Sequence, residues 1–260
     1  MKQFHTLIAS DVDGTLIPEE AVVIPDAVFD AVRKAYDLGY LFVAASGRQY
    51  YSLRALFEPV VDKMAFLIEN GSALFWQDKM IHADAFDRDL AISIAKYVQA
   101  TPNCEFLADG EGDSCVIPKT EAFIHQLVDV QKLSIVQISD FEEFPEQIMK
   151  IAVWCTDGAE CHEADFKAAY GDRAQIAISG RTWIDFSAAN KGQGIRATCR
   201  MFDIPMERTI AFGDNWNDVT MLDAVAHPYI MASARPEIRA KYANVCDSVP
   251  AQLEKIFENI

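Results

Sequence analysis

The segment HTLIASDVDGTLI, residues 5–17, joins a short apolar run to two aspartates separated by one residue. The apolar run has the residue types of a buried strand, and Gly14 after it favours a turn. Residues two apart on a strand project to the same side, so Asp11 and Asp13 can face one cleft at the carboxyl end of a parallel sheet, where such sheets bind ligands. Judged on this spacing alone, a solvated turn is an equally good interpretation.

The composition is that of a folded and strongly acidic protein. Its 260 residues are 51% hydrophobic and carry a formal net charge of −16. This length permits one large domain or two smaller ones. The negative field would repel nucleic acid and anionic lipid, so we expect no nucleic-acid partner and no membrane contact. An anionic ligand would need a local positive group, such as a metal ion or a few focused cations.

The N-terminal sequence and the cysteines predict a cytoplasmic location. Residues 1–10 contain no apolar stretch long enough for a secretory signal, and the chain has no apolar run of about 18 residues. The six cysteines include no C-x-x-C pair, which predicts reduced thiols. The one cluster to consider, Cys155, Cys161 and His162, lacks a fourth ligand at zinc spacing, so we interpret it as packing or surface thiols.

The alternation of apolar runs with amphipathic stretches predicts the domain organisation. The expected fold class is α/β: a Rossmann-like, doubly wound parallel-sheet core of residues 1–82 and 186–260, with an inserted α+β domain at 83–185. We expect strands at 5–10, 40–46, 65–70, 148–155, 174–180, 182–188, 208–214 and 228–233, a hairpin around 77–79, a strand pair within 104–118, and helices at 24–39, 49–58, 87–100, 119–132, 162–170, 191–202 and 217–225, followed by two closing helices.

Three later stretches place polar residues at the ends of predicted strands or the starts of predicted helices. They are Ser46 in AASGR, Lys191 in ANKG, and Asp214, Asn217 and Asp218 in FGDNWND. Each stretch alone is weak, because a lone lysine is usually solvated and the last two residues could simply cap a helix. Together they supply oxygen ligands for a hard cation such as Mg²⁺, a lysine, a hydroxyl and a carboxylate nucleophile, which are the groups that phosphoryl transfer requires.

The stretches DVDGTL, SGR, NKG and GDNWND, in this order and with an insert between the second and third, resemble the four motifs of the haloacid dehalogenase superfamily. The size and position of the insert resemble the Cof-type phosphatases of subclass IIB. The resemblance covers residues 1–82 and 186–260. It implies a magnesium-dependent phosphoric monoester hydrolase acting on a small phosphorylated metabolite, with sugar phosphates as the leading class. It also implies that the insert is a cap that closes over the site and selects the substrate.

The same resemblance implies the roles of the aspartates. Asp11 is expected to be the nucleophile that forms an aspartyl-phosphate, and Asp13 to protonate the leaving oxygen and then activate water. Asp11 and Asp214 would give carboxylates to Mg²⁺ and Asp13 its backbone carbonyl, with Asp218 as a further ligand or as support. A carboxylate at position 13 argues for a phosphate ester rather than for dehalogenation, because the leaving group of an ester needs a proton.

The remaining motif residues are expected to bind the substrate. Ser46, Gly47, Lys191 and Asn217 would hold the transferring phosphoryl group, and Arg48 would reach the substrate or brace its own loop. These roles follow from the resemblance alone.

Two other functions remain open at this point. A phosphosugar mutase with the same nucleophile would return the phosphoryl group to a sugar rather than to water. A non-catalytic phospho-acceptor or binding module is disfavoured by Asp13 and by the insert of about a hundred residues, since a receiver domain needs neither. Trp216, inside the fourth motif, is expected to be a half-buried aromatic residue. The sequence makes no prediction of the oligomeric state.

Overall fold

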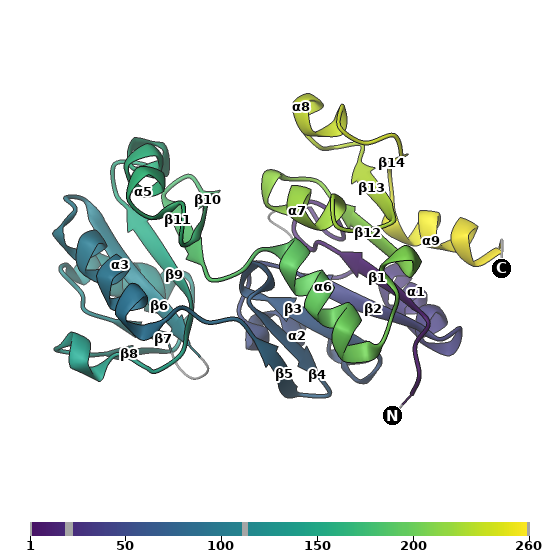
Figure 1. Ribbon diagram of the computed structural model, residues 1–260, viewed down its shortest axis with the longest axis horizontal. Coiled ribbons are helices and arrows are strands. Elements are labelled where there is room, and N and C mark those ends of the chain that lie inside the picture. Colours follow the sequence, from purple (N-terminus) through teal and green to yellow (C-terminus); the bar gives the residue numbers. More distant parts are fainter. Residues whose placement is uncertain (1, 19–22, 111–113, 259–260) are drawn as a thin grey trace. The chain divides into compact units, whose positions relative to one another are not determined.

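The computed structural model describes three stretches of the chain, residues 2–18, 23–110 and 114–258. These residues form two compact units (Figure 1). Unit 1 consists of Met1–Ala83 and Asn190–Ile260, and unit 2 of Asp84–Ala189. Unit 2 is therefore one continuous segment that interrupts the sequence of unit 1. Within the described stretches, no helix is long and apolar enough to cross a membrane.

Unit 1 is built on a mixed sheet with the strand order β14-β13-β12-β1-β2-β3-β4-β5. Its strands are, in chain order, β1 (Thr6–Ser10), β2 (Tyr40–Ala45), β3 (Met64–Ile68), β4 (Ala73–Trp76), β5 (Lys79–Ala83), β12 (Thr209–Gly213), β13 (His227–Met231) and β14 (Val245–Cys246). Neighbouring strands from β14 to β3 run parallel, whereas β4 and β5 form an antiparallel extension. Every residue of β2 and β3 is buried, as expected for strands covered on both faces.

Helices cover both faces of this sheet (Figure 1). They are α1 (Asp26–Asp37), α2 (Tyr50–Leu56), α6 (Lys191–Phe202), α7 (Val219–Leu222), α8 (Pro236–Arg239) and α9 (Val249–Glu258), with 3₁₀ turns η1 (Glu58–Lys63), η2 (Glu69–Gly71), η6 (Met206–Arg208) and η7 (Trp216–Asp218). Adjacent strand residues point to opposite faces. Leu41 packs in the cluster that contains Ile195 of α6, whereas Tyr40 contacts Phe257 of α9. The predicted fold class, a doubly wound α/β core with an α+β insert, is confirmed.

The strand register brings distant polar residues to one edge of the sheet. β1 pairs in parallel with both β2 and β12, and Ser10 lies beside Ala44 on one side and Phe212 on the other. The residues that follow these strands are therefore neighbours at the carboxyl edge. Asp11 directly follows β1 and Asp214 directly follows β12, so the two carboxylates are close although the chain between them is long.

Unit 2 is an α+β domain with the strand order β10-β11-β9-β6-β7-β8. Its strands are β6 (Cys104–Gly110), β7 (Ser114–Val116), β8 (Ile135–Gln137), β9 (Ile148–Cys155), β10 (Gln175–Gly180) and β11 (Trp183–Ser187). Its helices are α3 (Arg88–Ala100), α4 (Glu121–His125), the π-helix η3 (Gln126–Val130) and α5 (Glu163–Tyr170), with 3₁₀ turns η4 (Phe141–Glu143) and η5 (Ala159–Cys161). The pairs are antiparallel except for β7 with β8.

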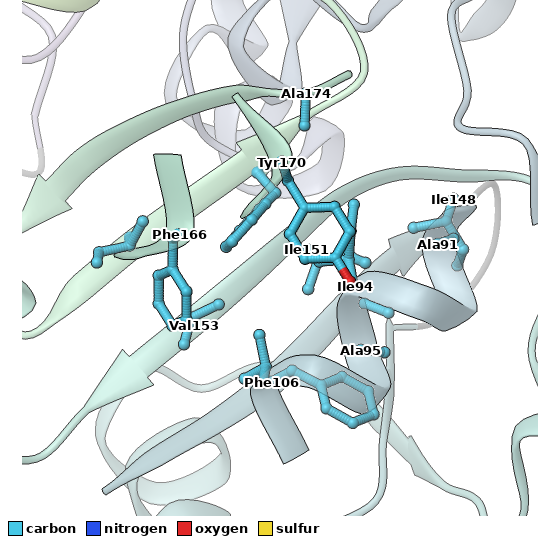
Figure 2. Packing of buried hydrophobic residues seen from close by; sticks show 14 of the residues in the cluster. Ala91, Ile94, Ala95, Phe106, Ile148, Ile151, Val153, Phe166, Tyr170 and Ala174 are labelled. Atoms are coloured by element: carbon cyan, nitrogen blue, oxygen red, sulfur yellow. The ribbon is translucent and has the colours of Figure 1, made fainter. Parts of the chain in front are cut away.

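Unit 2 has a hydrophobic core of its own, where α3 and α5 pack on one face of the sheet (Figure 2). Ile94 of α3 and Phe166 of α5 meet Phe106, Ile151 and Val153 from the strands, and all five side chains are buried. Burying one such side chain stabilises a fold by about 1.5–3 kcal/mol. The unit therefore has the apolar contacts that a separate domain needs.

Two helices differ from the predicted ones because local hydrogen bonds set their type or their first residue. The helix expected at 119–132 ends as a π-helix, in which the Gln131 N–H donates to the Gln126 carbonyl. The helix expected at 217–225 begins earlier, as a 3₁₀ turn, because Asn215 caps it. Strands β8 and β14 are missing from the prediction because three and two residues are too few to show an alternating pattern.

Candidate active site

Lys191 is a fully buried cation held between two carboxylates. Its Nζ donates to Oδ1 of Asp11 and to Oδ1 of Asp218, each at 2.6 Å. The side chains of Lys191 and Asp218 have no exposed surface, and that of Asp11 has almost none. Burying an ammonium without partners would be strongly unfavourable. The two carboxylates are therefore what allows a charged lysine to lie inside the fold.

The first turn of α6 fixes the position of Lys191. The Asn190 side chain accepts the Gln193 N–H at 3.0 Å, and the Gln193 side chain accepts the Asn190 N–H at 2.9 Å, which forms a capping box. A Cβ at Gly192 would collide with the backbone carbonyl of Thr220. The glycine of the NKG stretch thus allows α6 to pack directly against α7.

Burial and neighbouring charges shift the pKa values of this cluster. Burial opposes the charge of Lys191, but Asp11 and Asp218 outweigh it and raise its pKa, so the lysine stays protonated. Burial, followed by the charge of Asp218, raises the pKa of Asp11 well above its usual value, while Lys191 opposes that shift. A further positive charge beside Asp11 would favour its ionised form.

Asp214 adds a third carboxylate to the cluster. Burial, followed by the charge of Asp218, raises the pKa of Asp214 to about 6. A hydrogen bond from Thr15 Oγ1 to Asp214 Oδ1 at 2.9 Å opposes this shift. Gly14 has a φ of +92°, and a Cβ there would collide with the Asp214 carboxylate. The turn that follows the two aspartates therefore requires glycine, both for its backbone conformation and for this close approach.

The three carboxylates are arranged so that one cation could bind to them. One oxygen each from Asp11, Asp214 and Asp218 lies within 4.8 Å of the other two. The charge of Lys191 alone does not balance three carboxylates, and hard cations such as Mg²⁺ prefer oxygen ligands. Asp218 already accepts the N–H groups of Asp214 and Asn215 on Oδ2, at 2.9 and 3.0 Å, as well as Lys191 on Oδ1. The donor set therefore fits a hard divalent cation held mainly by Asp11 and Asp214.

Asp13 has a different environment from Asp11. Arg48 donates from Nε to Asp13 Oδ2 at 2.9 Å and from Nη2 to Asp13 Oδ1 at 2.5 Å. In this bidentate pair the side chains of Arg48 and Asp13 are 29% and 30% exposed. The hydrogen bonds to Asp13 raise the pKa of Arg48. The two aspartates of the opening segment are thus each paired with a cation, one with a buried lysine and the other with a half-exposed arginine.

The loop after β2 and the turn η7 present the other predicted residues. Ser46 is buried, and its Oγ accepts the N–H of Arg48 at 3.1 Å, across Gly47. Asn217 is exposed on η7. The structure therefore joins Ser46 to the Asp13 side of the site by way of Arg48, whereas it leaves the side chain of Asn217 at the surface.

Two residues at the site are missing from the sequence prediction. Thr15 donates to Asp214, and the signal for it is a hydroxyl directly after the turn glycine. Asn215 accepts the Trp216 N–H at 2.8 Å and caps η7, and its signal is a short polar residue directly before the turn. Trp216 itself is 52% exposed, with Lys241 Nζ 5.7 Å from the centre of its ring.

Comparison with known proteins assigns the chain to the phosphoric monoester hydrolases. The sequence model of the haloacid dehalogenase-like hydrolases matches residues 8–251, so the chain belongs to that family. The family and the enzyme class predicted from the four motifs are confirmed.

Known proteins resemble the chain over most of its length. It is 23% identical over 246 residues to the 5-amino-6-(5-phospho-D-ribitylamino)uracil phosphatase YbjI of Escherichia coli. The aligned residues cover 91% of this chain and 89% of that protein. It is 26% identical over 262 residues to the phosphatase YwpJ of Bacillus subtilis, and the alignment covers 90% of this chain and 92% of that protein. The solved structure of the subclass IIB sugar phosphatase BT4131 has the same fold as this protein, with a TM-score of 0.81 at 21% identity. The superposition covers 98% of this chain and 100% of that chain.

Proposed function

We propose that the protein is a Mg²⁺-dependent phosphatase that hydrolyses a small phosphorylated metabolite, of the sugar phosphate class, through an aspartyl-phosphate on Asp11. The observation that supports this most directly is the fully buried Lys191, 2.6 Å from both Asp11 and Asp218. It places a permanent positive charge next to a carboxylate at the carboxyl edge of a parallel sheet, where such folds bind ligands. A phosphoryl group needs both a nucleophile and a nearby cation.

The two aspartates of the opening segment would divide the chemistry. An oxygen of Asp11 attacks phosphorus, the bond from phosphorus to the leaving oxygen breaks, and Asp13 gives that oxygen its proton. Asp13 then takes a proton from water as the water oxygen attacks the aspartyl-phosphate, which releases inorganic phosphate and restores the Asp11 carboxylate. Arg48, which donates to both oxygens of Asp13, would hold it in place for its role as base. One of these hydrogen bonds would open when Asp13 carries the proton for the leaving oxygen.

Mg²⁺ is the proposed cofactor. The carboxylates of Asp11 and Asp214 and the backbone carbonyl of Asp13 would hold it, and when bound it would neutralise charge on the phosphoryl oxygens. The raised pKa values of Asp11 and Asp214 support a cation here, because buried like charges are what a divalent cation relieves. Asp218 would act as support, since its oxygens already accept hydrogen bonds from Lys191 and from two backbone N–H groups.

The transferring phosphoryl group would be held by short-range donors. We assign this role to the Ser46 hydroxyl, the Gly47 N–H, the Lys191 ammonium and the Asn217 amide. A Cβ at Gly47 would lie 2.9 Å from Asn70 Oδ1, so the loop that carries this N–H is tightly packed. Such local donors are needed because the chain as a whole, with a net charge of −16, repels a phosphate ester.

The relatives support the proposed substrate class. YbjI is named for a phosphorylated ribitylamino-uracil and BT4131 for a sugar phosphate. We also propose that unit 2, which contains most of the predicted insert at 83–185, is the cap that sets substrate specificity. The enzyme would work in the cytoplasm, where its free cysteines stay reduced.

The test is a screen of phosphorylated metabolites with Mg²⁺ or with EDTA, measuring released phosphate. We expect release only with Mg²⁺, none from Asp11→Asn, and unchanged release from Asp30→Asn, which alters an acid on α1 whose side chain is 75% exposed. Circular dichroism checks that both variants keep the fold. Turnover by Asp11→Asn would rule out the nucleophile assignment. An isomerised sugar phosphate in place of free phosphate would make the protein a phosphosugar mutase.

A further inference from the structure

A second cluster of metal-binding side chains lies in unit 2, outside the site described above. The sulfur atoms of Cys104 and Cys155 are 3.6 Å apart, and a ring nitrogen of His162 lies within 4.8 Å of both. Both cysteines are fully buried, and the His162 side chain is 13% exposed. We propose that these three residues bind a divalent cation of the zinc type, a function separate from phosphate hydrolysis.

The backbone holds the two sulfurs at a spacing suited to a tetrahedral ion. Cys104 and Cys155 face each other on the neighbouring antiparallel strands β6 and β9. The Cys155 N–H donates to Thr182, and the flanking Thr156 N–H donates to Asn103, so the cysteines are a pair without mutual backbone hydrogen bonds, the kind in which side chains lie closest. Two Zn–S bonds of about 2.3 Å at the tetrahedral angle separate the sulfurs by about 3.8 Å, near the distance found here.

His162 brings the third ligand from the residue before α5, and it is already held by a carboxylate. Its Nε2 lies 2.8 Å from Asp157 Oδ1, and Asp157 Oδ2 accepts a hydrogen bond from Asn103 Nδ2 at 3.0 Å. A carboxylate that fixes the ring is the usual neighbour of a metal-binding histidine. The Asp157 side chain is 38% exposed and, bonded to the ring, would support the histidine from outside the coordination sphere, so the fourth position would be taken by water.

The chemistry of the cluster matches a borderline-soft cation better than Mg²⁺. Thiolate and imidazole ligands select Zn²⁺ and similar ions, whereas Mg²⁺ prefers oxygen. Binding would release the protons of Cys104 and Cys155 to solvent, and the two thiolates would balance the charge of the ion. The ion would then join the start of β6, the end of β9 and the start of α5.

Spacing in the sequence could not show this cluster. The sequence prediction considered Cys155, Cys161 and His162, but Cys161 is exposed and its Sγ donates to the Asp157 carbonyl instead. The actual partner of Cys155 is Cys104, 51 residues away in the chain. Only the register of two strands brings these sulfurs together.

The test is a Co²⁺ titration of the full-length, reduced, metal-free protein, followed by displacement with Zn²⁺. We expect the absorption of thiolate-to-cobalt charge transfer, which the carboxylates around Lys191 cannot give, at one ion per chain. It should be lost in Cys155→Ala and kept in the matched control Cys115→Ala, which alters a buried cysteine of β7 in the same unit. Zn²⁺ should raise the melting temperature of the wild type and not that of Cys155→Ala.

His162→Gln leaves both sulfurs in the core and keeps the test decisive if Cys155→Ala fails to fold. We expect it to weaken cobalt binding by at least about tenfold. The proposal is overturned if the reduced wild type shows no thiolate band, if the band survives in folded Cys155→Ala, or if His162→Gln binds cobalt as tightly as the wild type does.

Discussion

Replacing Lys191 by methionine leaves Asp11 and Asp218 buried without their shared cation. The two N–O distances are both 2.6 Å, and a hydrogen bond between charged groups contributes about 1.5–3 kcal/mol. The combined contribution of two such hydrogen bonds agrees with the cost of removing one partner from a buried ion pair, about 3–5 kcal/mol. We therefore expect the free energy of unfolding of unit 1 to fall by about 3–5 kcal/mol near neutral pH, without divalent cations.

Acid should recover part of this loss. The pKa of Asp11 is raised above its unfolded value even with Lys191 present. In the variant, the folded state therefore binds more protons than the unfolded state in the pH range between these two pKa values. The stability of Lys191→Met should increase as the pH falls through that range and decrease as the pH rises.

Urea unfolding, followed by hydrogen exchange in peptides from β1 and β12, reports on unit 1 separately from unit 2. The control is Lys34→Met, because Lys34 Nζ is also 2.6 Å from a carboxylate, that of Glu254, but the two side chains are 43% and 51% exposed. An exposed pair contributes only about 0.2–1 kcal/mol. Equal losses in the two variants, or a loss in Lys191→Met that grows on acidification, would refute the reasoning.

Three further predictions concern the cation site. Gly14→Ala forces a Cβ into the Asp214 carboxylate at a φ of +92°, a strain of about 1–3 kcal/mol, and initial rates of phosphate release should fall about tenfold or more. Thr15→Val removes the hydrogen bond to Asp214, so calorimetry should show Mg²⁺ binding about tenfold more weakly; an unchanged dissociation constant would contradict this. Because Asp214 has a pKa of about 6, protons compete with the cation in acid. The apparent Mg²⁺ dissociation constant should rise at least about tenfold per pH unit below that value, because the pKa of the other ligand, Asp11, is raised as well. A dissociation constant that does not change with pH would show that Asp214 is not a ligand.

The fold class could be predicted because long buried strands and capped helices have strong local signals. β2 and β9 are nearly continuous apolar runs, and α6 begins with an Asn cap and ends near Phe202 as its pattern predicts. Short elements have no such signal. The two residues of β14 are a strand only because β13 supplies hydrogen-bonding partners.

The candidate site could be predicted in outline, because strand ends of a parallel sheet meet at one edge. This rule predicts that Asp11 and Asp214 lie close together, and the structure has them in one cluster with Lys191; their catalytic roles stay predictions. The pairing of Asp13 with Arg48 could not be predicted, because it depends on the conformation of a side chain rather than on spacing. The same limit applies to contacts set by strand register in unit 2.

The central position of β1 also affects how the chain folds during synthesis. β1 pairs with β2, which is made about 30 residues later, and with β12, which is made about 200 residues later. At about 5–20 residues per second, a ribosome needs about 10–40 s to complete that second neighbour. Unit 2 is one continuous segment and can fold in the meantime. A nascent chain that pauses before β12 would thus have a finished unit 2 and an open apolar strand edge, the kind of surface that chaperones protect.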